Sequence, residues 1–284
     1  LALLQFLIQY CEAVVSLFDS NFLYWIMLIN GRWVVILVLT AHVDDLQVTG
    51  SRKMLNWLHS RLEDRLGKLK RQVLPYTHAG IEQVAIGNDC IRLHQDDFCS
   101  KLQTVSIGAH RSPSDDLDAK DKTTFRSLTC SCLWACQTQL QEVCQVTSLQ
   151  QAPSAPKVEH LMSINTVIKR LKSPNREKFG IWFPRLRAPY RVMTISHASP
   201  ANKKSNYATE GLISGLAEDR LHACDTDKDD FLNPELVQYL SGKMHLLQGS
   251  STKSKRVSHS TSHAETNAAA RGIPIGQIIQ LRLC

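Results

Sequence analysis

Residues 41–50 read Ala-His-Val-Asp-Asp-Leu-Gln-Val-Thr-Gly, and they predict a β-hairpin with two adjacent carboxylates, Asp44 and Asp45, at its bend. The apolar run Trp33 to Thr40 precedes them, and the short alternating segment Leu46 to Thr49 follows. Neighbouring side chains on a strand point to opposite faces, but a bend can aim at least one carboxylate into an open site. Paired carboxylates suit Mg²⁺, the ion of nucleotidyl transfer. Because Asp is common in turns, a plain polar turn is the alternative interpretation.

The segments around this hairpin predict a mixture of helices and strands. Asn30-Gly31 separates the apolar runs Phe22 to Ile29 and Arg32 to Thr40, which indicates a two-residue hairpin turn. Ser51 is expected to cap a helix that ends near Gly67, with its leucines on one face. Other expected helices span residues 1–15, 125–149, 158–171 and 263–271, and other expected strands span 83–86, 90–93, 181–183, 191–196 and 210–216. The polar residues 108–124 predict an exposed loop.

Composition indicates a globular protein of a reducing compartment. The 284 residues suffice for one large or two ordinary domains, and 43% of them are apolar. A formal net charge of +7 suits a polyanionic partner without requiring one. The nine cysteines form an odd count without a regular framework, which argues against structural disulfides. The most closely spaced cysteines lack a partnering His and do not match a zinc pattern. They are Cys130, Cys132, Cys136 and Cys144.

The ends of the chain predict a piece of a longer protein. The sequence begins with Leu1 rather than Met, and it stops at Cys284. Residues 1–18 are apolar but lack a basic leader and a cleavage site, so we do not expect a signal peptide. No uncharged apolar run reaches the length of a membrane span, and no membrane partner is expected. The sequence leaves open whether the protein is cytoplasmic or nuclear, because Lys253 to Arg256 is too short for a nuclear signal.

Three stretches, in this order, resemble the pol polyprotein of copia-type long-terminal-repeat retrotransposons. His42 to Gly50 resembles the reverse-transcriptase signature of an aromatic residue, any residue and two aspartates. Phe125-Arg126-Ser127-Leu128, with the following residues to Thr138, is similar to the connection between polymerase and ribonuclease H. Lys253 to Thr266 resembles the Ser-rich strand and the helix that carry a catalytic Glu of ribonuclease H. The segment Gly80 to Leu93 also fits the family.

The resemblance covers nearly the whole chain and implies an α+β fold. It implies a partial reverse-transcriptase palm and thumb followed by an incomplete ribonuclease H-like α/β domain. Residues 1–107 would form the partial palm and the segment after it, and residues 108–175 a mostly helical connection. Residues 176–284 would form the incomplete ribonuclease H-like domain.

The resemblance also implies an activity, RNA-directed DNA polymerase with ribonuclease H. Asp44 and a first palm Asp would hold Mg²⁺ at the primer end, with Asp45 as the neighbouring acid and a weaker metal contact. Glu265 would be one of several metal ligands that cut the RNA strand of a hybrid. The implied partners are RNA, DNA, RNA–DNA hybrids and the rest of the polyprotein. Hybrid recognition would depend on phosphates and backbone shape.

Several positions depart from the family pattern. His42 stands where the family usually has Tyr, and no segment matching the first palm Asp precedes Asp19. Ser196 to Ser199 aligns with the strand of the first ribonuclease H Asp, and that position is His197. Neutral imidazole is a poor ligand for a hard cation. We therefore expect a truncated copy of the enzyme that is inactive as an isolated chain.

Two further interpretations remain open. A passive nucleic-acid-binding remnant would use a basic surface and bind in a strongly salt-dependent way. Its residues would be Lys169, Arg170, Lys172, Arg176, Lys178, Lys253, Lys255 and Arg256. A calcium-binding EF-hand-like module would use residues 225–236, which begin Asp225-Thr226-Asp227-Lys228-Asp229. However, Asp230 replaces the turn Gly and Leu236 the closing Glu, so a flexible acidic insertion is the alternative there.

Overall fold

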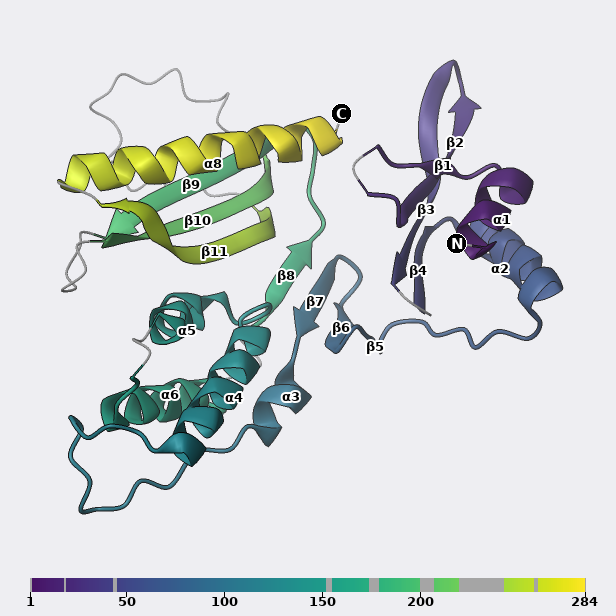
Figure 1. Cartoon of the computed structure of the whole chain (residues 1–284). Helices are drawn as coiled ribbons and strands as arrows, with labels where there is room; N and C mark the ends of the chain where they lie inside the picture. Colours follow the sequence, from purple (N-terminus) through teal and green to yellow (C-terminus); the bar gives the residue numbers. More distant parts are fainter. Residues whose placement is uncertain are drawn as a thin grey trace. The chain divides into compact units, whose positions relative to one another are not determined.

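The computed structural model describes residues 2–17, 19–42, 45–151, 155–173, 179–199, 207–219, 243–257 and 260–283. These residues form both helices and strands, so the predicted mixture of α and β structure is confirmed (Figure 1). The chain divides into two compact units, Leu1–Ile81 and Glu82–Cys284. The domain boundaries expected at residues 107 and 175 both lie inside the second unit. Within the described ranges, no helix is both long and apolar enough to cross a membrane.

The first unit is an antiparallel sheet with two helices packed on one face. Its helices are α1 (Ala2–Cys11) and α2 (Arg52–Leu66). Its strands are β1 (Val14–Val15), β2 (Phe22–Ile29), β3 (Arg32–His42), β4 (Asp45–Gly50) and β5 (Tyr76–His78). The first four strands pair in the order β1-β2-β3-β4. Their inner face and both helices share one core, which includes the fully buried Leu7, Leu23, Leu37 and Leu58.

Local signals account for the element boundaries in this unit. Asn30 and Gly31 have φ values of 50° and 76°, the left-handed conformation of a two-residue hairpin turn, as predicted. The side chain of Ser51 accepts a hydrogen bond from the Met54 amide, which caps α2 as predicted. The expected helix at residues 1–15 is shorter in the structure. It ends at Cys11, and the next residue, Glu12, has a positive φ of 57°.

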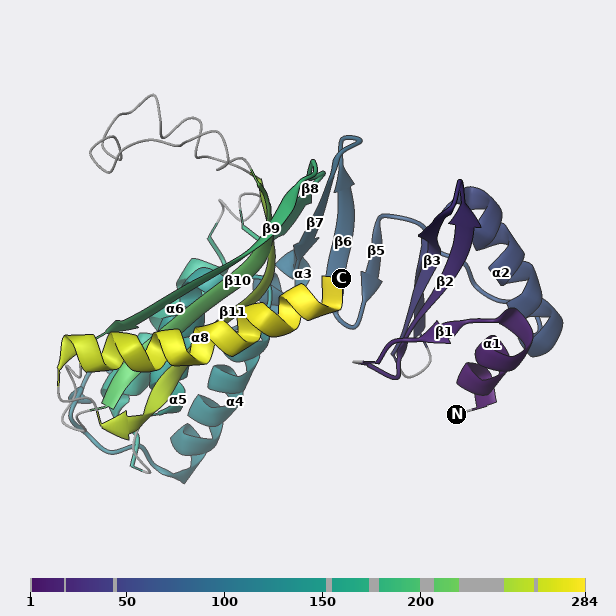
Figure 2. The ribbon, with the colours of Figure 1, turned by 90° about the horizontal axis from the view of Figure 1, so that it is seen from above.

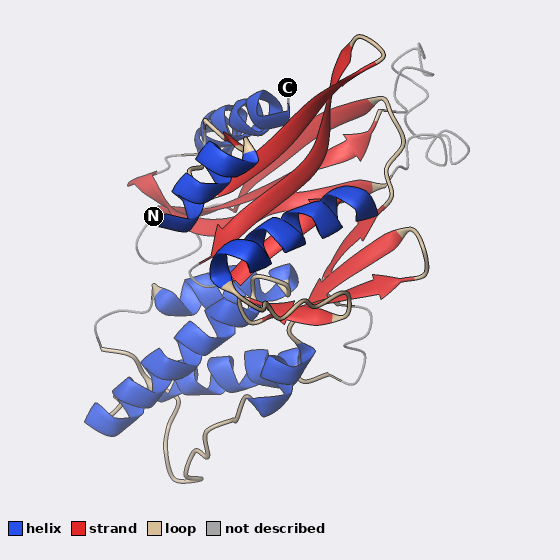
Figure 3. Cartoon of the chain, turned by 90° about the vertical axis from the view of Figure 1, so that its right-hand side faces the viewer, coloured by secondary structure: helices blue, strands red, loops and turns tan. Residues whose placement is uncertain are grey.

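The second unit begins with a helical part. Its helices are α3 (Asp96–Lys101), α4 (Ala119–Ala135), η1 (Leu140–Glu142), α5 (Val143–Gln150) and α6 (Val158–Leu171). They enclose one core, to which α6 contributes six buried residues. Figure 3 shows these helices gathered in one group beside the strands. The bounds predicted for α6 are confirmed.

Two predictions for the helical part were wrong. The loop expected to reach residue 124 ends earlier, because Asp118 accepts a hydrogen bond from the Asp121 amide at 2.7 Å and caps α4. The single helix expected over residues 125–149 is interrupted between Ala135 and Leu140. There, the fully buried Gln95 side chain hydrogen-bonds with the hydroxyl of Thr138 at 3.0 Å. A tertiary contact thus accompanies the break.

Two antiparallel sheets complete the second unit. In one, β7 (Cys90–His94) lies between β6 (Ile81–Ile86) and β8 (Ile181–Pro184). The other contains β9 (Tyr190–Ser199), β10 (Tyr207–Glu218) and β11 (Met244–Val257), in the order β11-β10-β9. The final helix, α8 (Thr261–Leu283), lies along this second sheet (Figure 2). Small side chains permit the close approach, namely Ala198, Ala208, Ala264 and Ala268.

Candidate functional site

Asp45 lies at the end of a β-hairpin, as predicted. It is the first residue of β4 and pairs with His42, the last residue of β3. Its side chain is exposed. Asp44, the other predicted metal ligand of this hairpin, lies outside the described residues.

The sheet face that carries Asp45 is polar and lies beside β5. Residues opposite each other in an antiparallel pair share a face, so His42, Asp45 and Gln47 all point to this side. The ring of His42 lies 6.1 Å from the ring of His78, centroid to centroid, in an edge-on arrangement. A hydrogen bond joins Gln47 to the Tyr76 hydroxyl, and burial nevertheless raises the pKa of Tyr76. Among the described residues, this face of the hairpin carries the Asp45 carboxylate and the His42 imidazole, and the His78 ring and the Tyr76 phenol of β5 lie against it.

The described part of this hairpin does not by itself fit Mg²⁺. This ion needs near-octahedral coordination by oxygen ligands, and one or two carboxylates usually supply the protein's share. Asp45 is a single exposed carboxylate. Within the described part of the chain, no group of three or more His, Cys, Asp or Glu residues could hold a metal ion.

In the second unit, the structure brings together His197 and Glu265, the two residues of the predicted ribonuclease H-like centre. His197 lies on β9, and Glu265 lies near the start of α8. Nδ1 of His197 is 2.9 Å from Oε1 of Glu265. The other carboxylate oxygen accepts a hydrogen bond of 3.0 Å from the amide of Ala198. Each carboxylate oxygen of Glu265 thus has a nitrogen partner, and the side chain ties the start of α8 to β9.

This arrangement does not fit a magnesium centre either. Magnesium prefers oxygen ligands, and the group that faces Glu265 is an imidazole nitrogen. The pair lies at the surface, with 77% of the His197 side chain and 35% of the Glu265 side chain exposed. At the position of His197, an oxygen-preferring ion would therefore find an imidazole nitrogen in place of a carboxylate.

A second polar contact fixes α8 further along its length. Nη1 of Arg271 lies 3.7 Å from a carboxylate oxygen of Glu210 on β10, and it donates a hydrogen bond to Thr252 on β11. The Glu210 side chain is 10% exposed, so this charge depends on its partner. A Cβ added at Gly272, next in the chain, would lie 3.0 Å from the Leu212 side chain. The helix therefore sits directly on the sheet, with Glu265 held in place at its start.

In the described part of the chain, the predicted basic residues do not form one continuous surface of unpaired charges, because some of them have partners within the chain. Nη1 of Arg170 lies 3.3 Å from a carboxylate oxygen of Glu142. Nζ of Lys172 donates a hydrogen bond of 2.8 Å to the carbonyl of Leu102. Three of the described residues have exposed side chains, namely Lys169, Arg170 and Lys253. Arg176 and Lys178, and the side chains of Lys255 and Arg256, lie outside what the structure describes.

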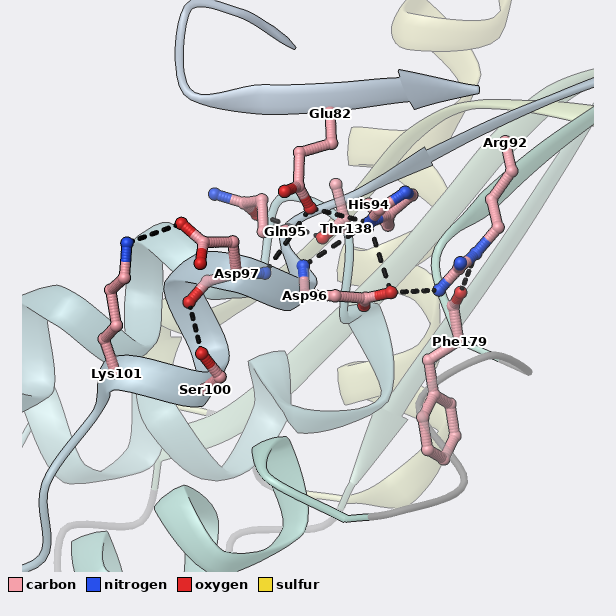
Figure 4. A network of polar contacts seen from close by, with 10 residues as sticks. All are labelled: Glu82, Arg92, His94, Gln95, Asp96, Asp97, Ser100, Lys101, Thr138 and Phe179. Carbon is pink, nitrogen blue, oxygen red and sulfur yellow. Dashed lines mark hydrogen bonds and ion pairs between the residues drawn. The ribbon is translucent and has the colours of Figure 1, made fainter. Parts of the chain in front are cut away.

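A polar network that was not singled out from the sequence connects β6, β7 and α3 (Figure 4). Nδ1 of His94 lies 2.8 Å from a carboxylate oxygen of Glu82 and 3.2 Å from one of Asp96. The same Asp96 oxygen is 2.9 Å from Nη2 of Arg92. Nε of Arg92 donates a hydrogen bond of 2.8 Å to the carbonyl of Phe179, shortly before β8. An imidazole and a guanidinium therefore share one carboxylate.

The contacts of this network indicate an anchoring role. The Arg92 side chain is 8% exposed, and its guanidinium carbon lies 5.8 Å from the centre of the Trp182 ring. A buried guanidinium is costly unless its donors are paired, and here they are paired with the Asp96 carboxylate of α3 and with the Phe179 carbonyl. The sequence contained a signal for part of this polar network, the Glu82–His94 contact. Extending the predicted hairpin by one residue pair beyond Gln83 and Leu93 sets Glu82 opposite His94.

The cysteines and the acidic loop add no described metal site. Cys132 and Cys136 are buried, whereas Cys130 and Cys144 are exposed, so the four side chains do not converge. Burial, followed by neighbouring acidic groups, raises the pKa of both buried thiols to about 12. The alternative calcium loop, residues 225–236, lies outside the described residues. Comparisons of the chain with protein-family models, curated proteins and solved structures found no match.

Proposed function

We propose that this chain derives from the pol polyprotein of a copia-type long-terminal-repeat retrotransposon, and that its ribonuclease H-like part no longer cleaves RNA. The contact between His197 and Glu265 carries the proposal. In the retrotransposon family, a Glu on a helix and an Asp on a strand supply metal ligands. Here three antiparallel strands precede a helix, and Glu265 on that helix lies beside the first of these strands.

The first unit supports the same origin. Its two successive hairpins carry Asn30-Gly31 at one turn and Asp45 at the end of the other. Asp45 shares a polar sheet face with His42, which stands where the family usually has an aromatic Tyr. Reverse-transcriptase palms present their paired aspartates on such a hairpin. For the polymerase part, we therefore propose only that it descends from a reverse-transcriptase palm.

We expect the loss of RNA cleavage because an imidazole, His197, faces Glu265 where the family has a carboxylate. Cleavage of the RNA strand in this family uses divalent metal ions held by several carboxylates. In this chain, His197 replaces one of those carboxylates and occupies one oxygen of Glu265, while the Ala198 amide occupies the other. His197, Ala198 and Glu265 thus join α8 to β9. We expect the chain to retain only salt-dependent binding to RNA–DNA hybrids.

A single substitution tests this proposal. His197→Asp would place two carboxylates side by side, which repel each other until a divalent cation binds between them. At a Mg²⁺ concentration ten times the Kd, binding stabilises a protein by about 1.4 kcal/mol. We therefore expect Mg²⁺ to raise the Tm of His197→Asp by a few degrees and to leave the Tm of the wild type unchanged. His110→Asp, an exposed loop position with the same change of side chain, serves as the control and should not respond.

Hybrid cleavage is measured on the same proteins in Mg²⁺. The wild type should bind a labelled RNA–DNA hybrid at low salt and leave it intact. Robust cleavage by the wild type, lost in Glu265→Gln, would show that the centre is active and would overturn the proposal. Failure of His197→Asp to respond to Mg²⁺ would argue against the derivation of this site from a paired-carboxylate centre.

A further inference from the structure

The far end of the β2–β3 hairpin has no neighbouring strand among the described residues. β1 pairs only with Leu23 and Tyr24 of β2, and β4 pairs with β3 only from Leu37 onward. Residues Ile26–Ile29 and Arg32–Val35 pair with each other alone. We call these two segments the apolar arm; Figure 1 shows it as the free end of the hairpin. Both of its edges therefore present backbone N–H and C=O groups that no described strand uses.

The apolar arm is exposed on both of its faces. Directly opposite residues share a face, so Ile26 and Leu28 lie with Val35 and Trp33 on one side. The other side carries the remaining residues of the arm. The exposed fractions are 40% for Ile26, 48% for Met27, 56% for Leu28, 42% for Ile29, 69% for Trp33, 40% for Val34 and 54% for Val35.

Such a pattern is unusual for a solvated hairpin. A strand with one face in water alternates polar and apolar residues, whereas a continuous apolar run is typical of a strand covered on both faces. Natural sheet edges are commonly protected by charged residues or Pro. The arm contains one charge, Arg32 beside the turn, and no Pro. The sequence of the apolar arm is therefore typical of strands whose two faces are covered by other parts of a protein.

The exposed apolar area is large for a monomer. Together, the exposed fractions of the seven apolar residues correspond to roughly 700 Å² of surface over the two faces, of which edge-to-edge pairing covers the part beside the paired strands. This total exceeds the roughly 300–600 Å² of the largest apolar patch on a typical monomer. The net charge of +7 does not prevent association here, because only Arg32 lies on the arm.

We propose that the apolar arm is a homodimer interface, occupied by the arm of a second copy of this chain. The free edge of β2, Trp25 to Ile29, is uncharged throughout. An antiparallel pairing of two such edges around Met27 supplies each copy with the backbone partners that it lacks. The side chains of Ile26, Met27 and Leu28, which flank the paired edge, then contact those of the partner's β2 across it. The edge of β3 is less suitable, because it carries Arg32.

The test is the mass of the full chain in solution, measured by sedimentation velocity over a range of concentrations. The wild type should associate to a closed dimer with a micromolar dissociation constant. The double variant Leu28→Lys and Trp33→Lys puts charges on the exposed face of the arm and should raise that constant at least tenfold. The control variant, Leu17→Lys and Val73→Lys, makes the same kind of change at residues that are 97% and 70% exposed outside the arm, and it should remain dimeric.

Three outcomes would overturn the proposal. A wild type that remains monomeric, with the arm protected from hydrogen exchange, would show that another part of the chain covers the arm. An open series of larger species would indicate unspecific aggregation. A dimer that the arm variant does not weaken would place the interface elsewhere. Far-UV circular dichroism checks that both variants are folded. The assay contains neither nucleic acid nor metal, so its failure leaves the proposed loss of RNA cleavage untouched.

Discussion

Replacing Arg92 with Met tests whether the network around Asp96 anchors the second unit. The change keeps an apolar stem of similar length and removes the guanidinium. It deletes a charged hydrogen bond to Asp96 of 2.9 Å, worth about 1.5–3 kcal/mol. It also deletes the bond to the Phe179 carbonyl, worth about 1 kcal/mol, and the contact with Trp182, worth about 0.5–1 kcal/mol. Solvent screening is limited, because the Arg92 and Asp96 side chains are only 8% and 25% exposed.

We therefore expect Arg92→Met to lower the free energy of unfolding of the second unit by about 3–5 kcal/mol. Urea unfolding followed by circular dichroism measures this loss, and hydrogen exchange of the α6 amides assigns it to the second unit. The control is Arg185→Met, which removes an exposed ion pair of 3.8 Å to Asp89 and should change little. Equal effects of the two substitutions would refute the anchoring role, as would a loss below about 1 kcal/mol for Arg92→Met.

Three further predictions concern the core, a helix cap and the thiols. Leu161→Ala in the core of α6 should cost about 2–5 kcal/mol in urea unfolding; a smaller cost would mean that the core is loosely packed. Ser51→Ala should cost about 1 kcal/mol through loss of the α2 cap, whereas Ser60→Ala on the same helix should not destabilise. The pKa values of Cys132 and Cys136 rise from 9.0 to about 12 on folding, so the free energy of unfolding should fall as the pH rises from 9 to 12. Replacing both cysteines with Ala should make the free energy of unfolding depend less steeply on pH. An unchanged pH dependence in this variant would contradict the prediction.

Turns and caps were predictable because they depend on a few consecutive residues. Asn30-Gly31 defines the β2–β3 turn, and Ser51 and Gly67 bound α2. The apolar spacing of α6 is equally local, and its predicted bounds agree with the structure. Each of these features requires only a φ value, a capping oxygen or a helical repeat. No distant contact is needed to specify them.

The break between α4 and α5 was not predictable, because its partner is distant in the sequence. Thr138 hydrogen-bonds with Gln95, which lies 43 positions earlier in the chain. Helix propensity over residues 125–149 contains no sign of that contact. The network of Arg92 has the same character, since its carbonyl partner Phe179 lies 87 positions away. Buried polar groups must find partners wherever the fold supplies them.

In the candidate site, too, some features depend on neighbouring residues and others on contacts between residues far apart in the chain. The sequence by itself determined that Asp45 lies at the end of a hairpin and that Glu265 lies near the start of a helix, because turn residues and helical repeats act over a few positions. Only the tertiary structure decided that Glu265 pairs with His197 and Ala198, and that the hydrophobic end of the β2–β3 hairpin remains exposed. Both outcomes depend on which surfaces meet after the chain has collapsed, and residues far apart in the chain share no local signal that specifies such meetings.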